Sequence, residues 1–133
     1  MEKTYLSGEQ LLVDSFKLAK MILTSGFKPT FIIALWRGGA PIGIAVQEYL
    51  SYHGIETDNI AIRTSSYAAG IDQQSREVKV HDLKYVVKNV QDHDKLLIVD
   101  DVFDTGRSIA AVLNQLRVAT RLNMPRDVRI AIP

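Results

Sequence analysis

The sequence contains no cysteine, and this absence excludes both a disulfide scaffold and a thiolate metal site. No apolar run is long enough to span a bilayer as a helix. The first ten residues, MEKTYLSGEQ, lack the apolar stretch of a secretory signal peptide. The formal net charge is only +1, so no overall field favours nucleic acid or a membrane surface as a partner. These absences predict a cytoplasmic protein with neither kind of partner.

The chain is long enough for one domain with a real core. It has 133 residues, of which 47% are hydrophobic and 23% charged, which is ordinary for a soluble globular protein. We therefore expect a single domain over residues 1–133. The sequence stops directly after DVRIAIP, which has the pattern of a core strand. Because a core strand rarely ends a complete α/β domain, we expect this domain to be truncated at its C-terminus.

Short apolar runs alternate along the chain with segments of helical periodicity. The expected helices cover residues 7–26, 41–54 and 108–122, and the expected strands cover 31–36, 59–65, 84–87, 95–100 and 128–132. Residues 66–80 are polar, contain glycine and show no clear period, so they predict a long excursion from the core. The alternation predicts an α/β fold, in which helices flank a central, mainly parallel sheet with right-handed crossovers.

The loop after the strand at 95–100 carries an unusual set of polar residues. Ligands of open α/β sheets bind beyond the carboxyl ends of the strands. There Asp100 and Asp101 stand side by side, and adjacent carboxylates need a cation or hydrogen-bond donors to stay ionised. Mg²⁺ and sugar hydroxyls supply both. The segment from Asp104 to Ser108 opens a helix, whose free N–H groups suit a phosphate. Helix capping and solvation alone would not require three carboxylates on one loop.

A second loop, Arg37-Gly38-Gly39, follows the strand at 31–36 and precedes Pro41. Arginine binds phosphate through two hydrogen bonds at once, and glycine permits a close approach of the backbone. Alone the signal is weak, since Gly-Gly before a helix is often only a turn, and neither a Walker A loop nor GxGxxG is present. Together the two loops predict a ligand with phosphate at both ends and a sugar between them.

At this point the sequence resembles a known family. LLIVDDVFDTGRSI (96–109) resembles the phosphoribosyl pyrophosphate (PRPP) motif of the type I phosphoribosyltransferases, and the RGG loop resembles their pyrophosphate loop. TSSYAAGIDQQSRE (64–77) is similar to the mobile catalytic loop of purine members, especially bacterial xanthine-guanine phosphoribosyltransferase. The resemblance runs from the first helix to the last strand. It implies the family's fold, with a mobile catalytic loop and a C-terminal hood that would lie beyond Pro133.

The resemblance implies a reaction and a role for each site residue. The protein would transfer the phosphoribosyl group of PRPP to hypoxanthine, guanine or xanthine, in purine salvage, and release pyrophosphate. Asp104, Arg37 and Tyr67 would be catalytic, with Asp104 managing the proton on N7 of the purine, and Asp100 and Asp101 would hold the ribose directly or through Mg²⁺. The substrate-binding set would be Arg37 and Gly38 at the pyrophosphate, Asp104, Thr105, Gly106, Arg107 and Ser108 at the 5′-phosphate, and Ser66, Tyr67 and Arg76 closing over both.

The resemblance also leaves alternatives open. The same fold serves as a PRPP- or nucleotide-binding regulatory module, whereas Ser65-Ser66-Tyr67 disfavours a pyrimidine-type transferase. Base choice cannot be read from this sequence, because the family's base-recognition segment lies beyond Pro133. The family further implies a homo-oligomer, a dimer or tetramer, and a cis peptide bond between Trp36 and Arg37. We expect Trp36 itself to be a core residue and the three histidines to lie on the surface.

Overall fold

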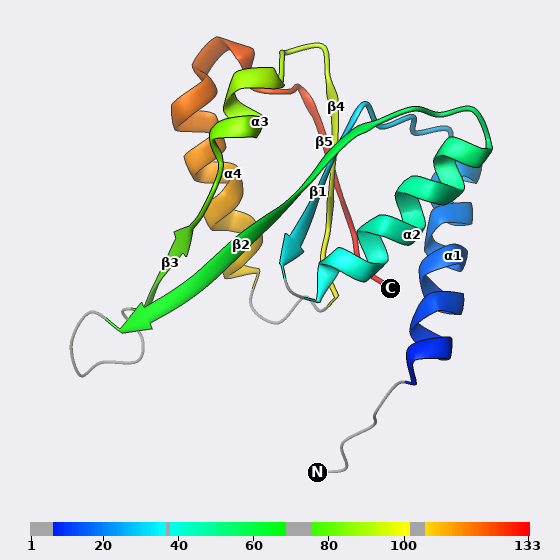
Figure 1. Cartoon of the computed structure of the whole chain (residues 1–133). Helices are drawn as coiled ribbons and strands as arrows, with labels where there is room; N and C mark the ends of the chain where they lie inside the picture. The colour runs from blue at the N-terminus through cyan, green and yellow to red at the C-terminus, as the bar shows by residue number, and fades with distance from the viewer. Residues whose placement is uncertain (1–6, 37, 69–75, 102–105) are drawn as a thin grey trace.

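The computed structural model describes residues 7–36, 38–68, 76–101 and 106–133, which form a five-stranded sheet between helices (Figure 1). In chain order the elements are α1 (Gly8–Ser25), β1 (Phe31–Trp36), α2 (Gly39–Tyr52), β2 (Asp58–Ala68), β3 (Arg76–Val80), α3 (Lys84–Asn89), β4 (Lys95–Val99), α4 (Arg107–Thr120), a 3₁₀ turn (Arg121–Asn123) and β5 (Asp127–Ala131). None of the helices in these ranges is long and apolar enough to cross a membrane.

The strand order across the sheet is β3-β2-β1-β4-β5. Strands β2, β1, β4 and β5 run parallel, and β3 pairs antiparallel with β2. The sheet is therefore mixed and mainly parallel, as the sequence predicts. Because β2 lies on one side of β1 and β4 on the other, the chain reverses its direction of travel across the sheet at β1. Such a switch point is where open α/β sheets bind ligands.

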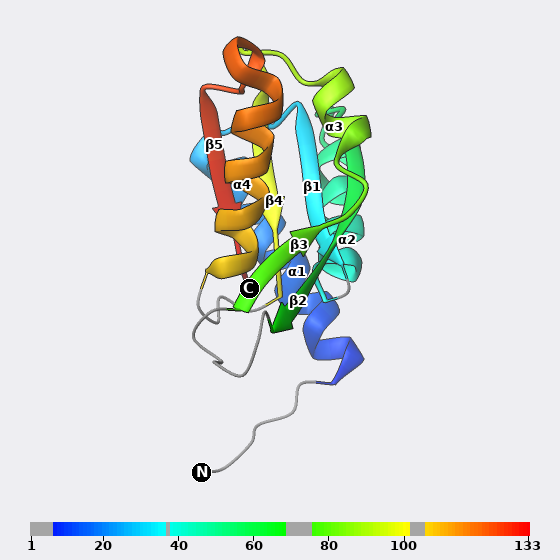
Figure 2. The ribbon, with the colours of Figure 1, turned by 90° about the vertical axis from the view of Figure 1, so that its left-hand side faces the viewer.

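Two hydrophobic layers hold the helices on opposite faces of the sheet (Figure 2). Alternate residues of β1 point to opposite faces: Ile33 packs with the buried residues of α3 and α4, and Ile32 with those of α1 and α2. Burying one such side chain contributes about 1.5–3 kcal/mol. The run FIIAL can therefore be apolar throughout, because helices cover both of its faces.

Both ends of α1 match the helix that the sequence predicts over residues 7–26. The Ser7 side chain accepts a hydrogen bond of 3.0 Å from the backbone N–H of Gln10, which satisfies one of the free donors of the first turn. Gly26 ends the helix with φ 84°, and its N–H donates to the carbonyl of Leu23. Glycine adopts this left-handed conformation without the steric cost of a side chain.

Two sequence predictions about the fold are wrong, and a third is right only in part. Residues 84–87 belong to helix α3 and not to a strand, because burying Val86, which is 0% exposed, outweighs the β-propensity of the valine pair. The excursion at 66–80 is partly regular, since β2 continues to Ala68 and β3 returns beside it. Trp36 is 51% exposed and is not a core residue; with Ile44 it lines an apolar groove of about 260 Å³ beside α2.

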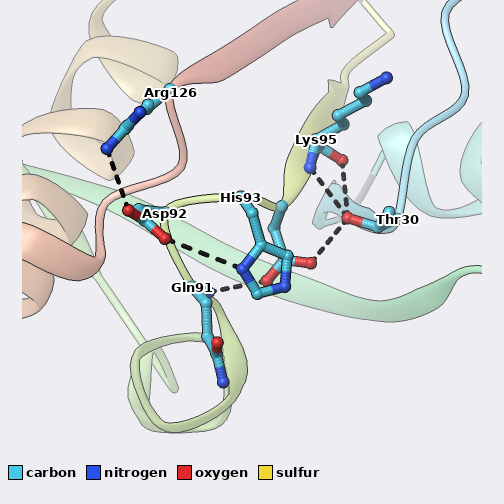
Figure 3. Close-up of polar contacts among 7 residues, drawn as sticks. Thr30, Gln91, Asp92, His93, Lys95 and Arg126 are labelled. Carbon is cyan, nitrogen blue, oxygen red and sulfur yellow. Dashed lines mark hydrogen bonds and ion pairs between the residues drawn. The ribbon is translucent and has the colours of Figure 1, made fainter.

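The amino ends of β1 and β4 are joined by a polar network (Figure 3). The Thr30 hydroxyl donates to Asp94 at 2.8 Å and accepts from the backbone N–H of Lys95 at 2.9 Å. On the same side Arg126 pairs with Asp92 at 3.2 Å. This end of the sheet is closed by side chains that satisfy one another, so it contrasts with the carboxyl end, where glycines and carboxylates meet.

Candidate functional site

The two loops singled out in the sequence meet at the carboxyl ends of β1 and β4. These strands are parallel neighbours, with Ala34 opposite Val99. A Cβ added at Gly39 would lie 2.6 Å from the carbonyl oxygen of Val99, and one added at Gly38 would overlap the carboxylate of Asp101. At Gly39 the clash is with backbone, so a side chain there would push the loops apart, whereas at Gly38 the Asp101 side chain would have to turn away. This close approach places Gly38 directly beside the acidic pair.

Asp100 and Asp101 follow β4 and differ in environment. Asp100 is half-buried and its Oδ1 accepts a hydrogen bond of 2.8 Å from the backbone N–H of Asp101, whereas Asp101 is exposed. Burial raises the pKa of the Asp100 carboxyl to about 6, and the adjacent Asp101 carboxyl adds to the rise more than the backbone hydrogen bond opposes it. A cation or a ring of donors facing Asp100 would stabilise its charged form and lower its pKa again.

The described residues fit Mg²⁺ only in combination with a ligand. Mg²⁺ usually takes one or two carboxylates and completes its shell with substrate phosphates and water. Asp100 and Asp101 are such a pair, and their oxygens are the donors that a hard cation prefers. Within residues 7–36, 38–68, 76–101 and 106–133, no three His, Cys, Asp or Glu side chains converge as a metal site would require. The donor set therefore suits an ion that arrives with a phosphate-bearing molecule.

Helix α4 begins at the same carboxyl end of the sheet (Figure 1) and can receive an anion. Its N-cap is Gly106, with φ 74°, which has no side chain to bond the first-turn N–H groups. Arg107 and Ser108 form the start of the helix, and the N–H of Ala110 already donates to the carbonyl of Gly106 at 2.9 Å. The N–H groups and the partial positive charge of this helix end favour a phosphate.

A two-stranded ribbon extends past the carboxyl end of β1. The last residue of β2 opposite β1 is Arg63, and residues 64–68 pair only with β3 in the described part of the sheet. The backbone of Ser66 lies opposite Val78, and that of Tyr67 opposite Glu77. The ribbon therefore carries these candidate residues, with Arg76 at the start of β3, on the same edge of the sheet as the two loops (Figure 1).

Some of the predicted site residues fall outside the described ranges. They are Arg37, Asp104 and Thr105, and with Arg37 goes the predicted cis bond to Trp36. Sequence reasoning also missed two side-chain contacts at the base of the ribbon, one of them between the hydroxyls of Thr64 and Ser108, 3.4 Å apart. The Ser65 hydroxyl lies 2.9 Å from Nε2 of His81, so this histidine is tied to β2. The run of small polar residues TSS (64–66) was the signal available in the sequence, and it indicates no partner.

Residues 2–121 match the phosphoribosyl transferase domain family. No curated protein matches the chain closely in sequence.

Solved structures resemble the whole of the chain. A purine phosphoribosyltransferase from Pyrococcus horikoshii is 23% identical with a TM-score of 0.73, and the match covers 99% of this chain and 77% of that one. A hypothetical protein from Neisseria gonorrhoeae with bound ppGpp is 20% identical with a TM-score of 0.75, covering 98% and 81%. The hypoxanthine-guanine phosphoribosyl transferase of L. donovani is 18% identical with a TM-score of 0.66, covering 98% and 70%. At these identities the likeness shows the fold, which is the type I fold that the sequence predicts.

Proposed function

Because the chain belongs to the phosphoribosyl transferase domain family, we propose that it transfers the 5-phosphoribosyl group of PRPP to hypoxanthine, guanine or xanthine. The products are the nucleoside monophosphate and pyrophosphate. The observation that carries the proposal is the close approach of the glycine loop to the acidic pair, with Gly38 against Asp101, at the end of the sheet where α4 begins. PRPP has pyrophosphate at one end, a 5′-phosphate at the other and ribose hydroxyls between them.

Each candidate residue then has a task. Asp100 and Asp101 bind the ribose hydroxyls, directly or through Mg²⁺, which when bound neutralises charge on the leaving pyrophosphate. Arg37 and Gly38 bind the pyrophosphate. The N–H groups and hydroxyls from Asp104 to Ser108 bind the 5′-phosphate. Asp104, at the head of this segment, also moves the proton on N7 of the base.

The ribbon would protect the reaction from water. The transition state at the anomeric carbon has oxocarbenium character, so water would capture it readily. Ser66, Tyr67 and Arg76 lie on the strands that pass the end of β1, and we propose that their side chains exclude water while the bond to pyrophosphate breaks. We also propose that the protein is cytoplasmic. We propose further that it acts as a dimer or tetramer, and sedimentation of the purified protein tests this oligomeric state.

The solved structures bear on the choice of substrate. The purine enzymes of P. horikoshii and L. donovani support a purine acceptor. The N. gonorrhoeae protein with bound ppGpp supports the second candidate, a nucleotide-binding regulatory module on the same fold. A spectrophotometric assay with PRPP, Mg²⁺ and each of hypoxanthine, guanine, xanthine and adenine separates them. Nucleotide formation with an oxopurine supports the enzyme, and ligand binding without turnover supports the module.

The assay also tests the proton-transfer role of Asp104. We expect Asp104→Asn to lower turnover by roughly two to four orders of magnitude, the usual effect of losing a general acid–base group. The equilibrium binding of PRPP should weaken much less, because the amide keeps the size of the carboxylate and one of its acceptor oxygens. Turnover close to that of the wild type would remove Asp104 from the mechanism.

A divalent cation should be required for turnover. Asp100 and Asp101 offer oxygen donors of the kind that Mg²⁺ prefers, and PRPP brings further oxygens. We expect excess EDTA to abolish activity and added Mg²⁺ to restore it better than Zn²⁺ does. Full activity in EDTA would mean that the two carboxylates act on the ribose without a metal.

A further inference from the structure

We propose that Thr64 is a positioning residue that orients the hydroxyl of Ser108 toward a phosphate bound at the start of α4. The inference rests on the proposed function, because it takes Ser108 as part of the 5′-phosphate site. Thr64 acts through Ser108 and has no task of its own on the reacting atoms.

The placement of Thr64 follows from the alternation of β2. Ile60, Ile62 and Thr64 share one face of the strand. Ile62 is 0% exposed and packs in the same core as Ile109 of α4. Thr64 is the next residue along that face, so its side chain reaches the first turn of α4 just beyond the apolar contacts. A hydroxyl at this position meets the only part of α4 that a phosphate would approach.

The contact itself is a hydroxyl pair. The Thr64 hydroxyl donates to the Ser108 oxygen at 3.4 Å, between residues 44 apart in sequence and in a half-buried environment. A serine hydroxyl has one proton to donate and two lone pairs to accept with. When Ser108 accepts from Thr64, its own proton remains available for an anion. The contact thus selects the hydroxyl orientation in which Ser108 is a donor to the site.

Binding of a phosphate should strengthen this contact. A hydroxyl that donates to an anion becomes a better acceptor, so successive hydrogen bonds in a chain reinforce one another. The separation of 3.4 Å is long for an O–H···O bond, whose usual range is about 2.5–3.0 Å. The pair therefore has room to shorten when Ser108 is drawn onto a phosphate oxygen.

Thr64 is also held more firmly than a loop residue would be. Arg63, the residue before it, pairs with Trp36 of β1, and Thr64 itself pairs with Val80 of β3. Its side chain is β-branched, which restricts χ1. The sheet therefore fixes the position of the Thr64 hydroxyl, and this hydroxyl in turn restrains a side chain on the neighbouring helix.

Binding measurements with two probes test the inference. GMP carries a 5′-phosphate but no pyrophosphate, whereas inorganic pyrophosphate supplies the pyrophosphate group without a 5′-phosphate. We expect Thr64→Val, which keeps the shape and loses the hydroxyl, to weaken GMP binding about threefold to tenfold, the usual worth of one hydrogen bond. Pyrophosphate with Mg²⁺ should bind as it does to the wild type. Thr64→Ser should restore GMP binding, because it returns the hydroxyl.

A double-mutant cycle shows whether the effect passes through Ser108. Thr64→Val should add nothing to the loss caused by Ser108→Ala, since the hydroxyl it orients is already absent. Ser65→Ala is the matched control, because Ser65 lies on the opposite face of β2 and bonds His81. It should leave the GMP affinity unchanged. Melting temperatures of all variants separate loss of the fold from loss of the contact.

The possible outcomes distinguish a failure of this inference from a failure of the proposed function. Equal weakening of GMP and pyrophosphate by Thr64→Val, independent effects of Thr64→Val and Ser108→Ala, or a similar loss in Ser65→Ala would each overturn the positioning role. Wild-type binding of GMP and PRPP with an unaffected Thr64→Val variant would overturn this inference alone. Failure of the wild type to bind either ligand would overturn the proposed function and this inference together.

Discussion

Asp100 is the residue at which folding and binding make opposite demands. Its carboxyl is half-buried beside Asp101, and burial raises its pKa to about 6. Near neutral pH the charged form is therefore held in surroundings that disfavour it. A ligand that brings a cation or several donors would relieve this cost, so part of the cost of forming the site is recovered when the ligand binds.

The raised pKa predicts a pH dependence of stability. The folded protein binds a proton at Asp100 more tightly than the unfolded chain, whose aspartates titrate near 3.8. Between pH 4 and pH 6 the contribution of Asp100 to stability should therefore decrease as the pH rises. We expect Asp100→Asn to flatten this slope in urea titrations and to raise stability at pH 7 by up to about 1 kcal/mol, after allowance for solvent screening.

A comparison variant separates the two causes of the shift. Asp101→Asn removes the neighbouring carboxyl and leaves the burial, which is the larger cause. It should reduce the slope between pH 4 and pH 6 only in part. Identical pH profiles for the wild type and Asp100→Asn would show that Asp100 titrates alike in the folded and unfolded states. The stabilised Asp100→Asn variant should also bind PRPP more weakly, because it loses a charge that we assign to the ribose and Mg²⁺.

At the scale of elements, α2 packs closely onto β1. A Cβ added at Gly43 would lie 2.7 Å from the Cβ of Ala34, well inside van der Waals contact. Gly43 and Ala34 therefore let the helix approach the strand closely. This approach sets the position of the first turn of α2, and with it the position of Gly38 and Gly39.

A larger residue at this contact should destabilise the domain. We expect Gly43→Ala to lower the free energy of unfolding by about 1–3 kcal/mol, the usual cost of overpacking, measured by urea denaturation. Ala34→Gly in the same chain should return part of the loss by making room. Gly8→Ala is the control, since nothing lies within 4 Å of the added Cβ. If Gly43→Ala were as stable as this control, the helix and strand would have to lie farther apart.

The sequence predicted the elements well where periodicity was strong and failed where packing decides. Continuous apolar runs marked β1 and β4 correctly, because helices cover both faces of these strands. Val86 and Val87 favour a strand by propensity, but they lie in helix α3, where Val86 packs with the buried residues of α4. Trp36 ends an apolar run but lies beyond the helical cover, so its burial could not be read from the run.

The candidate site was predictable in part for a related reason. Short motifs identify residues that act through their own backbone and side chain, as in the glycine pair and the acidic pair. The contact of Gly38 with Asp101 follows once the two strands that precede these residues are parallel neighbours. Contacts such as Thr64 with Ser108 depend on which strand residue faces which helix turn. A local sequence pattern does not show such long-range pairings.

At the scale of the whole molecule, the two ends of the sheet are built differently. Side chains that bond one another close the amino end (Figure 3), and close-packed glycines with carboxylates occupy the carboxyl end. The central strands β1 and β4 join these ends and are buried on both faces. Strand β3 has one strand neighbour among the described residues.

This contrast predicts the order of amide exchange. In deuterium exchange read by mass spectrometry, peptides covering Leu96–Val99 should exchange slowest, because their amides open only with the global fold. Peptides covering residues 76–80 should exchange faster, on the order of tenfold or more, through local opening of the ribbon. Equal protection of both segments would mean that the ribbon and the core open as one unit.

The continuity of β2 has a mechanical consequence. Residues 58–63 of β2 pair with β1 in the sheet, whereas residues 64–68 pair with β3 in the ribbon. The ribbon can therefore act as a lever that pivots at Thr64. Ala68 stands four residues farther on, or about 13 Å at the usual rise of a strand. A bend of about 10° at the fulcrum would swing Ala68 through about 2 Å, given that same rise. Small bends of β2 at Thr64 therefore become larger displacements of the segment that carries Tyr67.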